Sequence, residues 1–225
     1  MVYKTKVLLT LLFVMIINFT ILGQHNVGLK VSLGVSKTFT TTQESPVSYD
    51  SKLMLSGSAG MFYTYNFNNK STFIAELLFT QISGNEKTES ALYVSQSTNI
   101  PLVVANYTIY KHISYLSLPL SYGIKINKTT FSLGAQISRI VASKGKLEGQ
   151  SNSSGSITNL NNNQYDLGLN NYDWGPKIGL FHDLRKNTML EVNYYYGMNH
   201  KDKNTTKGSN QQMTIGIRHN LWNKL

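Results

Sequence analysis

Residues 26–37 read NVGLKVSLGVSK, with an apolar side chain at every second position. An extended strand sends successive side chains to opposite faces, so the apolar residues share one face and glycine, serine and lysine share the other. A helix would instead space its apolar residues three and four apart. The stretch therefore predicts a β-strand with one apolar and one mixed face. The apolar face holds Val27, Leu29, Val31, Leu33 and Val35.

The same two-residue period recurs in seven later segments. Residues 188–198, for example, carry leucine, valine, tyrosine and methionine on one face, against a mixed set on the other. Each segment has about the 9–11 residues that a tilted strand needs to cross a membrane, or slightly more. The eight predicted strands cover residues 26–37, 55–67, 71–83, 111–126, 129–143, 171–183, 188–198 and 211–222.

The connections between these strands alternate in length. Three are turn-sized and rich in asparagine and lysine, at residues 68–70, 127–128 and 184–187. The others, at residues 38–54, 84–110, 144–170 and 199–210, are long. A membrane-spanning barrel has tight turns at its inner end and long loops at its outer end. The sequence therefore predicts an all-β fold, an eight-stranded antiparallel up-and-down transmembrane β-barrel with an interior filled by side chains.

Two of the long connections have a pattern of their own. Residues 92–109 show some strand periodicity, which is consistent with a hairpin that continues beyond the membrane. Residues 149–163 are almost entirely serine, asparagine and glycine, so we expect a flexible loop there.

The composition fits a surface that meets lipid. Charged residues make up 14% of the chain and aromatic residues 11%, with 14 tyrosines. The net charge of +10 would suit nucleic acid, but the basic residues are scattered and no recognition module is present. Basic loops against lipopolysaccharide and the headgroups of outer-membrane lipid are the simpler explanation. The absence of cysteine excludes a disulfide framework and zinc sites built on cysteine.

The first residues have the features of an export signal. Lysines lie within residues 1–6, an apolar stretch follows over residues 7–22, and Gly23 offers a small residue for cleavage. We expect a signal peptide over residues 1–23 and an outer-membrane β-barrel domain over residues 24–225. An uncleaved helical anchor is the alternative.

The mixed faces of the strands carry charges of both signs. If the odd-numbered strands run outward, these charges gather near the periplasmic end of the barrel. Unpaired charges in a narrow interior are costly, so we predict an ion-pair network that plugs it. A general acid and base pair of Glu76 with Glu191 is the alternative, but neighbouring cations would keep both ionised. The predicted network comprises Lys30, Glu76, Lys125, Lys177, Glu191 and Arg218.

No pattern in the chain indicates catalysis or cofactor binding. The five histidines lack the spacing of metal ligands, and there is no nucleophile elbow, phosphate-binding loop or dinucleotide fingerprint. The sequence therefore predicts no catalytic, metal or cofactor residue.

Five stretches, in this order and spacing, resemble the PorT-like outer-membrane β-barrel family common in Bacteroidetes. They are KVSLGVS at 30–36, AELLFTQ at 75–81, YLSLPL at 115–120, LGAQIS at 133–138 and EVNYYYG at 191–197. The resemblance implies a location in the Gram-negative outer membrane, with both termini in the periplasm. For a few relatives it also implies a role in type IX protein secretion, and it supplies no catalytic residue.

These observations favour a non-enzymatic outer-membrane barrel with a structural or interaction role, whose partners are outer-membrane lipid and proteins that meet its long loops. Two alternatives stay open. One is a small barrel enzyme acting on lipid or peptide, which would need a polar cluster at the loop end. The other is a soluble lipocalin-like barrel, whose apolar face would point inward around a ligand.

Overall fold

The computed structural model describes residues 24–41, 49–93, 103–153, 156–165, 167, 172–201 and 207–224. The predicted signal peptide, residues 1–23, lies outside these residues. No helix in the described part of the chain is long and apolar enough to cross a membrane. The strands are β1 (Gln24–Thr41), β2 (Tyr49–Lys52), β3 (Met54–Asn66), β4 (Ser71–Tyr93), β5 (Val103–Ile126), β6 (Thr129–Ser153), β7 (Ser156–Tyr165), β8 (Tyr172–Arg185), β9 (Thr188–Lys201) and β10 (Lys207–Lys224).

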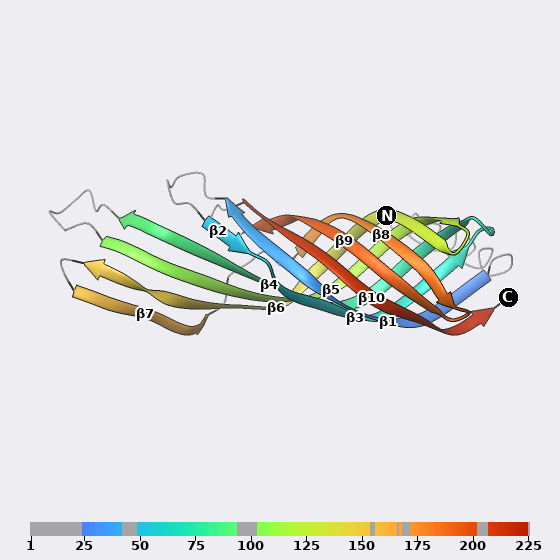
Figure 1. Cartoon of the computed structure of the whole chain (residues 1–225), viewed down its shortest axis with the longest axis horizontal. Coiled ribbons are helices and arrows are strands. Elements are labelled where there is room, and N and C mark those ends of the chain that lie inside the picture. The colour runs from blue at the N-terminus through green and yellow to red at the C-terminus, as the bar shows by residue number, and fades with distance from the viewer. Residues whose placement is uncertain are drawn as a thin grey trace, which may run out of the picture.

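Eight of the strands close into an antiparallel barrel (Figure 1). Their order around the wall is β4, β3, β1, β10, β9, β8, β6 and β5, and pairing of β4 with β5 closes the ring. Seven of the eight pairings join barrel strands that follow one another along the chain. The eighth pairs β1 with β10, the first strand with the last. The predicted eight-stranded up-and-down barrel is confirmed.

The short turns lie at one end of the barrel, which we call the turn end. They occupy residues 67–70, 127–128 and 186–187. Asn127 has φ of 55°, a left-handed conformation that asparagine tolerates better than most residues. Backbone hydrogen bonds join neighbouring turns, from Lys125 N to Lys70 O at 2.7 Å and from Asp183 N to Lys128 O at 2.8 Å.

At the opposite end, part of the wall continues far beyond the barrel (Figure 1). Strand β4 stops pairing with β3 at Gln81, and β6 stops pairing with β8 at Arg139, yet β4, β5 and β6 continue to pair with one another. Short β2 adds to the outer side of β4, and β7 adds to β6. We call this five-stranded sheet, in the order β2, β4, β5, β6 and β7, the sheet extension.

The predicted flexible loop at residues 149–163 is therefore wrong. Of these residues, 149–153 form the end of β6 and 156–163 form most of β7, and the two strands pair from Ser153 with Ser156 to Gly145 with Tyr165. Strands pair through main-chain hydrogen bonds, so β6 can add to β5 and β7 can add to β6 although these residues have no apolar face. The predicted continuation of the hairpin over residues 92–109 is present where described, since Tyr93 pairs with Val103.

The barrel has its apolar side chains outside and its polar side chains inside. Leu33 is 71% exposed, whereas its chain neighbour Ser32 is 2% exposed. Thirty or so large apolar residues share this outward face, an exposed area that a soluble monomer does not tolerate. The arrangement is that of a membrane barrel and excludes the soluble alternative with an apolar interior.

Candidate functional site in the barrel interior

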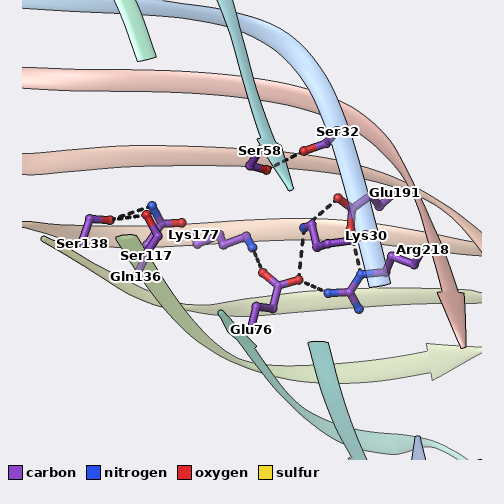
Figure 2. Close-up of polar contacts among 10 residues, drawn as sticks. All are labelled: Lys30, Ser32, Ser58, Glu76, Ser117, Gln136, Ser138, Lys177, Glu191 and Arg218. Atoms are coloured by element: carbon purple, nitrogen blue, oxygen red, sulfur yellow. Dashed lines mark hydrogen bonds and ion pairs between the residues drawn. The ribbon is translucent and has the colours of Figure 1, made fainter. Parts of the chain in front are cut away.

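Five charged side chains from five strands meet inside the barrel (Figure 2). Lys30 Nζ lies 3.1 Å from Glu76 Oε1 and 2.7 Å from Glu191 Oε1. Arg218 Nε donates to Glu191 Oε2 at 2.7 Å, and its Nη2 also contacts Glu76. Lys177 reaches the other oxygen of Glu76. We call Lys30, Glu76, Lys177, Glu191 and Arg218 the charge cluster.

The strand register brings these residues to one level of the interior. Lys30 on β1 lies directly opposite Arg218 on β10, and Glu191 on β9 lies opposite Gly216, two residues before Arg218. Glu76 and Lys177 approach from β4 and β8 across the interior. The alternation in the sequence shows which residues of each strand face the interior. The height of these residues along the barrel axis depends on the stagger of the strands around the barrel.

Two aromatic rings enclose the guanidinium of Arg218. Its Cζ lies 4.5 Å from the ring centre of Phe62 and 4.3 Å from that of Phe181, within the range of a cation–π contact. Gly28 makes room for this packing, because a Cβ there would lie 2.5 Å from the Phe62 ring and 2.2 Å from His219 O. The glycine and both phenylalanines belong to the mixed faces of their strands.

The cluster holds its charges away from water. All five side chains are buried, and each carboxylate contacts at least two cations. Desolvation of buried ions is offset only when geometry and hydrogen bonds are good, and removal of one partner leaves an uncompensated charge. The arrangement ties β1, β4, β8, β9 and β10 together and leaves neither carboxylate poised as an isolated acid or base.

Lys125, the sixth predicted member, does not join the cluster. Its Nζ binds Asp183 Oδ2 at 2.7 Å near the turn end, where the two side chains are 41% and 33% exposed. Lys125 lies two residues before the turn at 127–128, so its side chain reaches the rim of the barrel. Its partner Asp183 was not predicted, although it continues the alternation that places Lys177 inside.

A second polar group fills the interior on the side of the sheet extension. The Asn210 amide donates to Tyr115 Oη at 2.9 Å and to Asp173 Oδ2 at 3.1 Å. Sequence reasoning missed these three residues, because only charged residues of the mixed faces were considered for the network, which left out Tyr115, and because Asn210 precedes the predicted strand at 211–222. Asp173 lies on the mixed face of its strand, so the sequence pattern could have placed it in the interior.

Small hydroxyl and amide side chains lie beside the charge cluster in the interior (Figure 2). Ser32 and Ser58 share a hydrogen bond of 2.7 Å, and Gln136 donates to Ser138 at 3.0 Å. The cavity at this level, lined by Lys30 and Lys177 among others, measures about 10 Å³, the space of one water molecule. The interior is thus filled across its width.

Within the described residues, no three histidine, aspartate or glutamate side chains are grouped to hold a metal ion. The expected absence of metal and cofactor sites stays a prediction.

Solved structures with some likeness to this chain are outer-membrane proteins. Neisserial surface protein A shares 15% identity at a TM-score of 0.44, covering 88% of this chain and 98% of that one. Ail of Yersinia pestis, in complex with the heparin analogue sucrose octasulfate, shares 14% at 0.36, covering 87% and 98%. The outer membrane protease OmpT of Escherichia coli shares 8% at 0.36, covering 88% and 95%. Likeness at this level says nothing of what this chain binds or does.

The family comparison is more decisive. No curated protein matches the chain. A family model described as an outer membrane protein beta-barrel domain matches residues 18–202, which include most of the barrel and all of the sheet extension. Together with a closed barrel whose apolar side chains face outward, this match gives the location as the bacterial outer membrane. The chain therefore belongs to the outer membrane protein beta-barrel domain family.

Proposed function

We propose that this protein is a non-enzymatic outer-membrane scaffold that binds other proteins outside the cell through its sheet extension. The observation that carries the proposal is the extension itself, a five-stranded sheet projecting from one end of the barrel. The short turns at the other end support a periplasmic position for that end, because barrels keep their longer connections outside.

A barrel that is blocked at its middle argues against a diffusion pore. The charge cluster occupies the middle of the barrel, and the small cavity beside it measures about 10 Å³. Towards the sheet extension, Ile82, Ile113 and Tyr115 form a buried apolar group with Ile140 and Leu167 packed against it. A hydrated solute would have to displace both groups.

The sheet extension offers open strand edges. In the described part of the chain, β7 pairs only with β6, so its other edge presents unpaired main-chain groups along Ser156–Tyr165. The sequence of β7, SITNLNNNQY, contains no proline and no charged residue, the usual protections of an exposed edge. Such an edge suits a partner that adds an extended segment as one more strand.

Basic residues at the base of the extension suit a contact with lipopolysaccharide. Arg139 continues the outward apolar face of β6, directly beyond Ile137, and is exposed. Lys144 and Lys146 follow on the same strand and are exposed as well. Phosphate groups at the lipid surface would meet these cations at that height.

The finer family assignment is also a proposal. The five stretches that resemble PorT-like barrels of Bacteroidetes all lie in barrel strands, and they support membership of that group. They extend the proposed scaffold role to an accessory function in protein secretion. Deletion of the gene should then lower the amount of secreted protein in the medium, with the outer membrane otherwise intact.

Truncation of the extension tests the main proposal. The variant lacks residues 149–160 and joins Glu148 to Asn161 through an Asn-Gly turn, since these two residues pair across the hairpin. Cross-linking on intact cells followed by affinity capture should recover partner proteins with the full chain and lose them with the variant. Recovery of the same proteins by both chains, or turnover of lipid or peptide by the refolded protein, would contradict the proposal.

A further inference from the structure

A cavity of about 930 Å³ opens at the turn end of the barrel, and we call it the vestibule. Its inner wall includes Arg218 and Phe181, which belong to the packing around the charge cluster. Its sides carry amide and hydroxyl groups, such as those of Asn26, Thr64 and Asn220. This volume is in the range of pockets that bind small ligands.

Cations gather at the mouth of the vestibule. Lys125 lies near the end of β5 and Lys128 in the turn that follows, whereas Arg185 ends β8 and Lys186 lies in the turn after it. The two turns are neighbours because β6 pairs with β8, and the backbone hydrogen bond from Asp183 to Lys128 fixes them together. The barrel therefore concentrates cations that are about 60 residues apart in the sequence.

Most of this positive charge is not neutralised by the protein. Asp183 is the one carboxylate among the lining residues, and it binds Lys125. Within the described residues, the side chains of Lys128, Arg185 and Lys186 have no hydrogen-bond or ion-pair partner. Like charges around a concave mouth focus a positive potential into it, which favours an anionic occupant.

The wall of the vestibule also offers neutral hydrogen-bonding groups. Asn26, Thr64 and Asn220 carry amide and hydroxyl groups among the lining residues. An extended peptide matches both features, because its main chain has N–H and C=O groups and its acidic side chains have the carboxylates that the rim cations favour.

Other anionic ligands fit less well. The vestibule lies inside the ring of strands, so a lipid headgroup would have to leave the bilayer and cross the rim to enter it. Phosphate also offers no N–H donor to the amide and hydroxyl acceptors of the wall. Sugar rings favour open aromatic faces, but the one aromatic ring in the lining, Phe181, stacks against Arg218.

We propose that the vestibule binds an extended, acidic peptide segment of another protein, held by Lys128, Arg185 and Lys186 at the rim and by the amides of the wall. Given the orientation argued above, that protein lies in the periplasm. The site is at the opposite end of the barrel from the sheet extension and does not depend on it.

Fluorescence anisotropy with a fluorescein-labelled hexaglutamate peptide tests this site on the full chain, refolded in zwitterionic nanodiscs. The rim variant carries Lys128→Gln, Arg185→Gln and Lys186→Gln. The control carries Arg139→Gln, Lys144→Gln and Lys146→Gln, which removes the same charge at the other end. We expect about tenfold weaker binding by the rim variant and less than about twofold change in the control. Heat-modified gel mobility verifies that both are folded.

Three results would overturn the proposal. The first is equal weakening in both variants, which would mean attraction by net charge alone. The second is equally tight binding of labelled hexaglutamine. The third combines two measurements. Glycerophosphate would displace hexaglutamate at the same concentration as unlabelled acidic peptide does, and the wild-type protein, but not the rim variant, would bind anionic phospholipid vesicles. This last pattern would assign the rim to lipid phosphate.

Discussion

Glu76 contacts three cations from three other strands, Lys30, Lys177 and Arg218, more than any other member of the charge cluster. Its removal would leave Lys177 without its carboxylate partner and Arg218 with Glu191 alone. Buried positive charges would then face one another across the interior, where water cannot screen them.

We expect Glu76→Gln to lower the free energy of unfolding by about 3–5 kcal/mol. Urea titration of the refolded protein, followed by heat-modified gel mobility, measures the change. The matched control is Glu148→Gln, which breaks the exposed pair with Lys146 and should cost at most about 1 kcal/mol. Equal urea midpoints for wild type and Glu76→Gln would show that the cluster does not hold the barrel together.

Single residues also mark the limit of sequence reasoning. Strand alternation is enough to place Lys30, Glu76, Lys177, Glu191 and Arg218 on inward faces. Their common level, and the position of Lys125 at the rim, depend on how far each strand is staggered against its neighbour. A shift of one residue along a strand moves a side chain by about 3.3 Å. An error of one or two residues in the expected stagger is therefore enough to break an ion pair or to create a false one.

At the scale of elements, the barrel strands and the sheet extension follow different sequence rules. A strand that faces lipid on one side and a packed interior on the other must alternate, so all eight barrel strands were recognisable. Strand β7 lies beyond the barrel, and its residues SITNLNNNQY carry no such alternation. Its structure comes from pairing with β6, which the sequence alone does not reveal.

This division predicts that the extension and the barrel are energetically separable. Strand β6 pairs with β8 only as far as Arg139, and the cluster lies on the barrel side of that point. Removal of residues 149–160 should therefore change the free energy of unfolding by less than about 1 kcal/mol. Urea titration of the truncated chain measures this value. A large loss of stability would mean that the extension is needed to close the barrel.

For the whole molecule, the apolar exterior and the polar, charged interior are opposite to the pattern of a soluble barrel. This inversion could be read from the sequence, because Lys30, Glu76, Lys177, Glu191 and Arg218 lie on the mixed faces of their strands. The lipid-compatible residues lie on the opposite faces. The vestibule could not be read in this way. Its rim joins turns that are distant in the chain, and its volume depends on how far the interior side chains fill the turn end.

The sidedness of the barrel is the property on which both proposed binding surfaces depend. The chain has no cysteine, so single substitutions provide unique labels. Thr158→Cys places a thiol on β7 of the extension, and Lys186→Cys places one in an exposed turn. A membrane-impermeant maleimide should label the first in intact cells and the second only after the outer membrane is permeabilised. The reverse pattern would move the strand edge to the periplasm and the basic vestibule to the cell surface, because the strands fix both ends of the barrel relative to each other.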